Sequence, residues 1–224
     1  MQYHQNGFRA GDPHVAPSGS PKRPATPPDE VDVLIVGCGP AGLTLAAQLA
    51  RFADIRTCII DQKPGPLEFG QADGIACRSV EMFEAFGFAE KVLREAYWVN
   101  ETAFWTPDPG DPDAIARSDR IRDTEEGLSE FPHVILSQAR VHDFFLEHMR
   151  NGPARLEPYY NFALSELSHE PDADLPNLVT LTPTQGGPAR TMRARYVVGC
   201  DGARSQVRRH IGLQLEGDAA NQAW

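Results

Sequence analysis

A glycine-rich turn between a short apolar segment and an alanine-rich segment constrains the fold of this chain most. The turn reads Gly37-Cys-Gly-Pro-Ala-Gly42 and follows segment 31–36, which is apolar and β-branched like a buried parallel strand. Segment 43–52 is rich in Ala and Leu and predicts a helix, and segment 56–60 predicts a second strand. Together these elements predict a βαβ unit within an α/β protein.

The G-x-G-x-x-G spacing of this turn suits a loop that binds the pyrophosphate of a dinucleotide. Such a loop needs a tight turn, a backbone that the pyrophosphate can approach, and close packing of helix on strand. Pro40 stands in the first helical turn, whose N–H groups attract phosphate. Asp61 ends the second strand, where a carboxylate can accept hydrogen bonds from ribose hydroxyls and disfavours a 2′-phosphate. The sequence therefore predicts a Rossmann-like site for FAD or NAD rather than NADP.

Two further loops carry candidate ligand residues. Segment 70–74, Gly-Gln-Ala-Asp-Gly, holds Asp73, which either faces the dinucleotide site or only forms a turn. Segment 196–200 predicts a buried strand that leads into Asp201 and a glycine turn. A helix start follows, and three arginines in and before that helix could form a phosphate-binding patch: Arg204, Arg208 and Arg209. For Arg208 and Arg209 the alternative is a solvated helix face.

The remaining elements follow from hydrophobic period and turn residues. Helices are expected over 79–86, 88–96, 138–151 and 205–211. Strands are expected over 97–105, 115–121, 133–136, 162–168, 177–182, 191–195 and 196–200. The helix after Ser137 is amphipathic, with apolar side chains at spacings of three and four: Val141, Phe144, Phe145 and Met149.

The first thirty residues differ in composition from the rest. They carry six prolines among Gly, Ser, His and Lys, so residues 1–30 are expected to form an extended or mobile arm. Residues 31–224 are expected to form the dinucleotide-binding domain with the first strands of a second domain.

Charge and apolar content exclude several classes of function. The net charge of −10 disfavours sequence-independent nucleic-acid binding, which needs surplus Lys and Arg. The longest apolar runs are far shorter than a membrane span, and no secretory signal follows Met1. The four cysteines lack metal-site spacing, so they are expected to be buried and reduced, with no metal bound, in a cytoplasmic protein.

The three motifs together resemble the single-component flavoprotein aromatic hydroxylases, the superfamily of para-hydroxybenzoate hydroxylase and phenol 2-monooxygenase. Segments 70–74 and 127–140 are similar to the phenol hydroxylase branch, and segment 1–9 is similar to the arm of branch members that act on 3-hydroxybenzoate. The resemblance covers essentially the whole chain. It implies a Rossmann-like FAD-binding domain of the para-hydroxybenzoate hydroxylase type, with an incomplete antiparallel substrate sheet.

The resemblance also implies roles for residues at matching positions. The glycine turn would hold the FAD pyrophosphate, Asp61 the adenosine ribose, and Asp201 the region between ribityl chain and pyrophosphate. Asp73 would face the substrate hydroxyl, and His133 would line the same pocket or serve as a structural histidine. The FAD-binding residues implied in this way are Gly37, Gly39, Pro40, Ala41, Gly42, Asp61, Gln71, Asp73, Gly74, Gln138 and Asp201.

The reaction implied by the resemblance is hydroxylation of a small phenolic acid, 3-hydroxybenzoate to 3,4-dihydroxybenzoate, with phenol as the alternative substrate. NADPH would reduce FAD, and O₂ would then give a flavin C4a-hydroperoxide. A base near the substrate hydroxyl is required, because a phenolate supplies electrons better than a phenol. An exposed carboxylate, with a pKa of about 3.9, matches a phenol near 10 poorly. Asp73 must therefore be desolvated or act as a relay.

The length of the chain leaves more than one interpretation open. Members of this branch are much longer, so the 224 residues are expected to be an N-terminal fragment, inactive by itself, of a homodimeric enzyme. The alternatives are a complete, non-catalytic nucleotide-binding module and a NAD-linked dehydrogenase.

Overall fold

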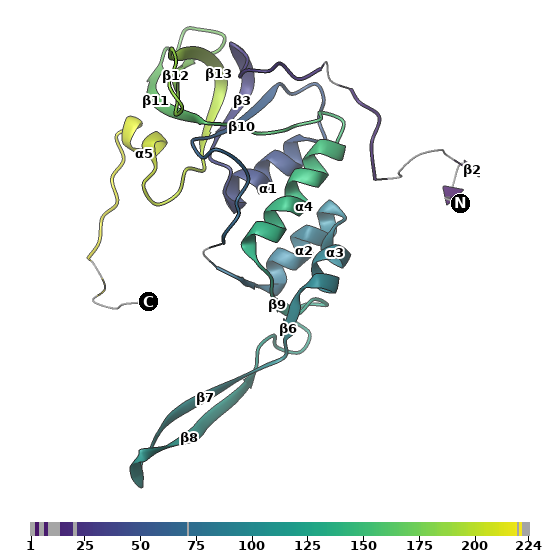
Figure 1. Cartoon of the computed structure of the whole chain (residues 1–224), viewed down its shortest axis with the longest axis vertical. Helices are drawn as coiled ribbons and strands as arrows, with labels where there is room; N and C mark the ends of the chain where they lie inside the picture. The colour runs from purple at the N-terminus through teal and green to yellow at the C-terminus, as the bar shows by residue number, and fades with distance from the viewer. Residues whose placement is uncertain are drawn as a thin grey trace. The chain divides into compact units, whose positions relative to one another are not determined.

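The computed structural model describes residues 3–4, 7–8, 14–19, 22–70, 72–218 and 220 (Figure 1). They divide into two compact units, one from Met1–Pro66 and Phe145–Trp224 and the other from Leu67–Phe144. Within these described residues, no helix combines the length and the apolar character that crossing a membrane would require. Near the N-terminus, β1 (Tyr3–His4) pairs antiparallel with β2 (Gly7–Phe8).

A mixed six-stranded sheet forms the centre of the first unit. Its strand order is β10-β4-β3-β13-β12-β11. The strands are β3 (Glu30–Val36), β4 (Thr57–Asp61), β10 (Tyr159–Tyr160), β11 (Phe162–His169), β12 (Asn177–Pro183) and β13 (Arg190–Gly199). Strands β10, β4, β3 and β13 run parallel to one another, whereas β12 pairs antiparallel with both β13 and β11. The βαβ prediction and the α/β fold class are confirmed.

Strand β13 corrects the prediction of two separate strands over 191–195 and 196–200. Its first half pairs antiparallel with β12, and its second half pairs in parallel with β3, up to Gly199 beside Val36. Nothing interrupts the strand, because no Gly, Pro or Asn separates its two halves. The expected burial of 196–200 is also wrong, since Tyr196 is 63% exposed and the other four residues are at most partly buried. One continuous strand thus joins the parallel and the antiparallel parts of the sheet.

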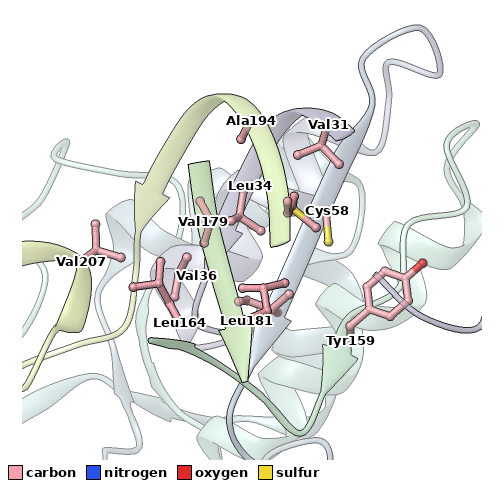
Figure 2. Close-up of a cluster of buried hydrophobic side chains, with 12 residues drawn as sticks. Val31, Leu34, Val36, Cys58, Tyr159, Leu164, Val179, Leu181, Ala194 and Val207 are labelled. Atoms are coloured by element: carbon pink, nitrogen blue, oxygen red, sulfur yellow. The ribbon is translucent and has the colours of Figure 1, made fainter. Parts of the chain in front are cut away.

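Figure 2 shows a buried cluster in the first unit that is built on this sheet. Leu34 and Val36 of β3 both enter it, as the two-residue period of a strand requires, and Val31 joins them from the start of the strand. Cys58 and Ile60 of β4 extend the same layer. The buried cluster consists of Val31, Leu34, Val36, Cys58, Ile60, Tyr159, Leu164, Val179, Leu181, Met192, Ala194 and Val207.

Three helices of the structure begin close to their predicted starts. Helix α1 (Pro40–Leu49) begins at the proline, three residues before the predicted segment, because Pro40 suits the first helical turn. Helix α4 (Gln138–Asn151) begins directly after Ser137, and its four predicted apolar residues are all buried. Helix α5 (Gln206–His210) follows Ser205, whose side chain accepts a hydrogen bond from the Arg208 N–H.

The described part of the N-terminal arm contacts the first unit. The Ala16 N–H donates to the Asn151 carbonyl at 2.9 Å, and the Tyr159 hydroxyl donates to the Pro24 carbonyl at 3.0 Å. The Arg23 guanidinium lies 3.7 Å from the centre of the Tyr159 ring. These contacts give the proline-rich segment defined partners at the end of α4 and at the start of β10.

The second unit combines two helices with a small sheet. Helices α2 (Cys77–Phe86) and α3 (Ala89–Glu95) are separated by Gly87, which has a left-handed φ of 83°. The aromatic ring of Phe88 stacks on Phe83 and on Phe144 of α4. The sheet is antiparallel, with strand order β5-β9-β6, where β5 is Gly74–Ile75, β9 is His133–Ile135 and β6 is Tyr97–Val99.

A two-stranded ribbon, drawn in teal in Figure 1, completes the second unit. It pairs β7 (Glu101–Asp108) with β8 (Asp111–Arg122). The predicted strand 97–105 is therefore wrong as a single element, because the chain leaves the β5-β9-β6 sheet at Asn100 and enters the ribbon. The ribbon exposes large apolar side chains, among them Trp105 and Ile115.

Candidate functional site

The predicted pyrophosphate turn lies where three parallel strands end. The Gly37 N–H donates to the carbonyl of Ile60 in β4 at 2.8 Å. The Cys200 N–H, directly after β13, donates to the carbonyl of Val36 in β3 at 2.7 Å. The carboxyl ends of β3, β4 and β13 therefore meet at this turn, which is the edge where α/β sheets bind ligands.

A different structural feature explains each of the three glycines of the turn. Gly37 has a φ of 108°, and a Cβ there would lie 2.4 Å from the Cys200 carbonyl oxygen. A Cβ on Gly42 would lie 2.0 Å from the Gly37 carbonyl oxygen. A Cβ on Gly39 would meet nothing within 4 Å. The outer glycines are required by packing, whereas the middle glycine keeps a space open in front of the turn.

The N-terminus of α1 faces this open space. Gly39 is its N-cap and supplies no side-chain hydrogen bond, and Pro40 and Ala41 form the first turn. The first N–H groups of a helix have no partner within it and carry partial positive charge. The arrangement fits an anionic group such as a pyrophosphate.

Asp61 lies beside the turn, as predicted, and also holds it in place. One carboxylate oxygen accepts from the Cys38 N–H at 2.7 Å, and the other accepts from the Lys63 N–H at 2.9 Å. Each oxygen keeps a second lone pair for a ligand hydroxyl. The structural role of Asp61 was not predicted, because only the fold brings its carboxylate to the backbone of Cys38.

Asp201 stands at the same edge and stabilises the start of α5. Its Oδ1 accepts from the Ser205 hydroxyl at 2.5 Å, and its Oδ2 accepts from the Gln206 and Val207 N–H groups at 2.6 and 3.2 Å. A carboxylate at a helix N-terminus is favourable for both hydrogen bonding and charge. A cavity of about 570 Å³ adjoins it, lined by Ala41 of α1, by residues of β13 and α5, and by Cys200 and Gly202 of the loop between them.

The four cysteines are free thiols. Cys38 and Cys58 are buried, as predicted, whereas Cys77 and Cys200 are partly exposed. Burial raises the pKa of Cys58 to about 12 and also raises the pKa of Cys38 and Cys200. Cys38, Cys58 and Cys200 are therefore protonated near neutral pH and are poor nucleophiles.

The second unit holds the other predicted site residues. The Leu136 N–H donates to the Asp73 carbonyl at 2.9 Å, which fixes segment 72–75 along β9. A Cβ on Gly70 would lie 2.6 Å from Cβ of Gln138, so this glycine permits close contact with the start of α4. The Asp73 side chain is exposed. Gln71 lies outside the described residues.

His133 is paired with a carboxylate that the sequence analysis missed. Its Nδ1 lies 2.6 Å from Oδ2 of Asp123, and the Thr102 hydroxyl donates to the other oxygen of Asp123 at 3.3 Å. Nε2 of His133 lies 3.2 Å from the position that a Cβ on Gly74 would occupy. Asp123 and His133 are ten residues apart in a segment without a periodic pattern, so no local signal links them.

The structure thus gathers the predicted residues into two groups, one in each unit. The glycine turn, Asp61 and Asp201 lie at one sheet edge in the first unit. Asp73, Gly74, His133 and Gln138 lie around β5 and β9 in the second unit, together with Asp123.

Residues 30–224 match the model of the FAD binding domain family. The chain belongs to this family. FAD is therefore its expected dinucleotide, in agreement with the glycine turn and with the acidic residue at the end of β4.

Curated relatives of this FAD-binding domain are flavin monooxygenases. The chain is 62% identical, over its whole length, to 3-hydroxybenzoate 4-monooxygenase of Comamonas testosteroni, of which it covers 36%. It is 35% identical, over 88% of its length, to a phenol 2-monooxygenase of Aspergillus fumigatus, of which it covers 32%. The chain thus spans about a third of the length of these relatives.

Solved structures share the fold. The flavin-dependent monooxygenase PieE, solved in complex with FAD and substrate, matches 86% of this chain with a TM-score of 0.71 at 24% identity, and the match covers 34% of that structure. The p-nitrophenol 4-monooxygenase PnpA of Pseudomonas putida matches 85% with a TM-score of 0.70 at 23% identity, and the match covers 46% of it. Both matches confirm the fold expected from the resemblance to para-hydroxybenzoate hydroxylase.

Proposed function

We propose that this chain is the FAD-binding part of a monooxygenase that converts 3-hydroxybenzoate to 3,4-dihydroxybenzoate with NADPH and O₂. The observation that carries the proposal is the 62% identity, over the whole chain, to a 3-hydroxybenzoate 4-monooxygenase. The glycine turn and the acidic residues at the sheet edge supply an independent chemical reason for the cofactor.

The residues of the first unit fit FAD. The open space at Gly39 and the uncapped N-terminus of α1 suit the pyrophosphate. The remaining lone pairs of the Asp61 carboxylate suit the adenosine ribose. Asp201 and the cavity beside it suit the ribityl end. Bound FAD would supply the redox and oxygen chemistry, and the protein supplies position and electrostatics.

The residues of the second unit suit a polar aromatic substrate. Asp73 and Gly74 are held along β9, and Gln138 begins α4 next to the same loop. A hydroxylated ring is more reactive when its phenol is deprotonated, so a proton acceptor is needed here. Asp73 and His133 are the candidates for catalysis, and Gln71, Asp73, Gly74 and Gln138 for contact with the flavin side.

The substrate distinguishes this proposal from its runner-up, a phenol 2-monooxygenase. The identity to the relative with that name is 35%, against 62% for the 3-hydroxybenzoate enzyme. We assign the whole protein to the cytoplasm as a homodimer without nucleic-acid or membrane partners, in line with its acidic, moderately apolar composition.

Substrate-dependent turnover tests the function. The full-length protein that carries this chain is purified, its flavin absorbance near 450 nm is recorded, and NADPH oxidation is measured with 3-hydroxybenzoate or with phenol. We expect 3,4-dihydroxybenzoate in an amount close to the NADPH consumed. Product from phenol alone would establish the runner-up, and a protein purified without flavin would refute both.

Gly39→Val tests the assignment of the pyrophosphate site. The side chain would fill the open space without meeting protein atoms at its Cβ, so we expect a folded protein that loses FAD. The control is Gly65→Val, another glycine whose Cβ would meet nothing within 4 Å, away from the turn. Bound FAD per chain and the thermal unfolding temperature are measured for both. A Gly39→Val protein with a full complement of FAD would refute the site.

A further inference from the structure

Asp123 and His133 form a hydrogen-bonded pair that the local fold holds in place. Asp123 directly follows β8, and its backbone N–H donates to the Asn100 carbonyl at 3.2 Å. His133 begins β9 and pairs with Val99 of β6. The backbones of Asp123 and His133 are therefore both fixed next to Asn100. Their side chains are joined by the 2.6 Å contact between Oδ2 of Asp123 and Nδ1 of His133. The Asp123 side chain is 19% exposed and the His133 side chain is 31% exposed, so the pair is only partly accessible to water.

The carboxylate decides which nitrogen of His133 carries the proton. An ionised carboxylate only accepts hydrogen bonds, so Nδ1 must be the protonated nitrogen of a neutral ring. The lone pair of the neutral ring then lies on Nε2. That atom lies beside Gly74, where the missing side chain leaves the approach to the ring open. Asp73 precedes Gly74 in the same loop.

We propose that Asp123 is a positioning residue that holds Nε2 of His133 as the proton acceptor for the phenolic hydroxyl of the substrate. This inference rests on the proposed function. The phenolic O–H bond breaks, its electron pair stays on the phenolate oxygen, and the proton forms an N–H bond at Nε2. The imidazolium that results is stabilised by a charge-assisted hydrogen bond to Asp123.

An imidazole suits this step better than the exposed carboxylate does. The usual pKa of histidine, about 6.5, is closer to that of a phenol than the usual pKa of about 3.9 for aspartate. Proton transfer is most effective when the acceptor titrates near the operating pH. Asp73 would then hydrogen-bond or orient the substrate, and His133 would take the proton.

Nitrogen NMR of the imidazole tests the positioning role without any turnover. In the full-length protein that carries this chain we expect His133 to be protonated at Nδ1 and not at Nε2 at neutral pH. Asp123→Ala should shift the ring toward the Nε2-protonated tautomer that free histidine favours. The control is Asp119→Ala, which removes a carboxylate from the exposed ribbon, where its Oδ1 accepts a local hydrogen bond from the Arg120 N–H. An unchanged tautomer in Asp123→Ala would overturn the inference.

Phenolate absorption tests the proton transfer itself. 3-Hydroxybenzoate is bound to the full-length, FAD-loaded protein, and the red-shifted ultraviolet band of its phenolate is measured. We expect His133→Gln to remove this band and to lower kcat about 100-fold. Asp123→Asn should lower the phenolate band and kcat about 10-fold each, with unchanged FAD content. Asp119→Asn should match wild type. A full phenolate band in His133→Gln would overturn the role of Nε2.

The two experiments separate this inference from the proposed function. If wild type does not hydroxylate 3-hydroxybenzoate, the proposed function fails while the tautomer measurement still reports on Asp123. If wild type hydroxylates it and Asp123→Asn behaves like Asp119→Asn in kcat and phenolate absorption, the inference alone fails.

Discussion

The candidate residues of the two units are held in place by different means. In the first unit the backbone fixes the site, since Gly37 and Gly42 are pressed against carbonyl groups and Asp61 binds two N–H groups. In the second unit side chains fix it, since His133 takes its orientation from Asp123. The backbone site leaves no room for a side chain at Gly37 or Gly42, whereas the side-chain site depends on a partner from another segment.

Under the proposed function, this difference separates cofactor recognition from substrate chemistry. FAD presents the same pyrophosphate to every protein that binds it, so a fixed backbone cradle serves it well. Phenolic substrates differ in size and charge, and side chains around a small sheet can vary without disturbing the main fold. The contrast predicts that small substitutions cost most in the first unit.

Gly37→Ala should have the largest effect. A Cβ there would lie 2.4 Å from the Cys200 carbonyl oxygen, and the φ of 108° is unfavourable for alanine. We expect the first unit to lose more than about 2 kcal/mol of stability, and FAD binding to disappear. Urea unfolding and bound FAD per chain are measured, with Gly65→Ala as the matched control. Normal stability and FAD content in Gly37→Ala would show that the turn has a different geometry in solution.

Leu34→Ala and Ile115→Ala compare the sheet core with the exposed ribbon. Leu34 is 0% exposed in the cluster of Figure 2, so its truncation should cost about 2–5 kcal/mol. Ile115 is 73% exposed, so its truncation should change stability by less than about 0.5 kcal/mol. The urea midpoint is measured for each variant. A large loss at Ile115 would mean that another surface covers the ribbon in solution.

The sequence predicted the local elements around the backbone site because their signals are local. The glycine turn, the strands on either side of it and the short helix near Ser205 each occupy a few consecutive residues, and the structure has all of them. The apolar spacing of α4 likewise identified its buried face. These features depend on period and turn chemistry within one segment.

The rest depended on contacts between segments that no local pattern reveals. Segment 97–105 looks like one strand, but its two halves find different partners on either side of Asn100. The continuity of β13 follows from pairing with β12 and β3 at once. The Asp123–His133 pair forms only because β9 and the end of β8 meet.

The two ends of helix α4 offer the comparison with the smallest expected effect, because the titratable groups at each end lie in different surroundings. His148, toward its C-terminal end, is half-buried, and burial, together with the Arg51 charge, lowers its pKa. Glu95 of α3 binds Arg140 at the other end of α4, and this hydrogen bond lowers the pKa of the exposed glutamate.

The two shifts act in different pH ranges. Because the pKa of His148 is lowered in the folded chain, the unfolded chain binds the proton at a higher pH, near the usual histidine pKa of about 6.5. The free energy of unfolding therefore falls as the pH falls from 7 to 5. A lowered glutamate pKa gives stability that is fully present above its usual value of about 4.3 and is lost only below it.

His148→Gln should therefore reduce the loss of stability between pH 7 and pH 5, whereas Glu95→Gln should leave the slope in that range unchanged. Exposed ion pairs contribute about 0–1 kcal/mol. Glu95→Gln should therefore lower the free energy of unfolding only slightly, and by the same amount at each of these pH values. Urea unfolding at pH 7, 6 and 5 measures the slope for wild type and both variants. An equal slope in wild type and His148→Gln would show that His148 is as well hydrated in the folded chain as in the unfolded one.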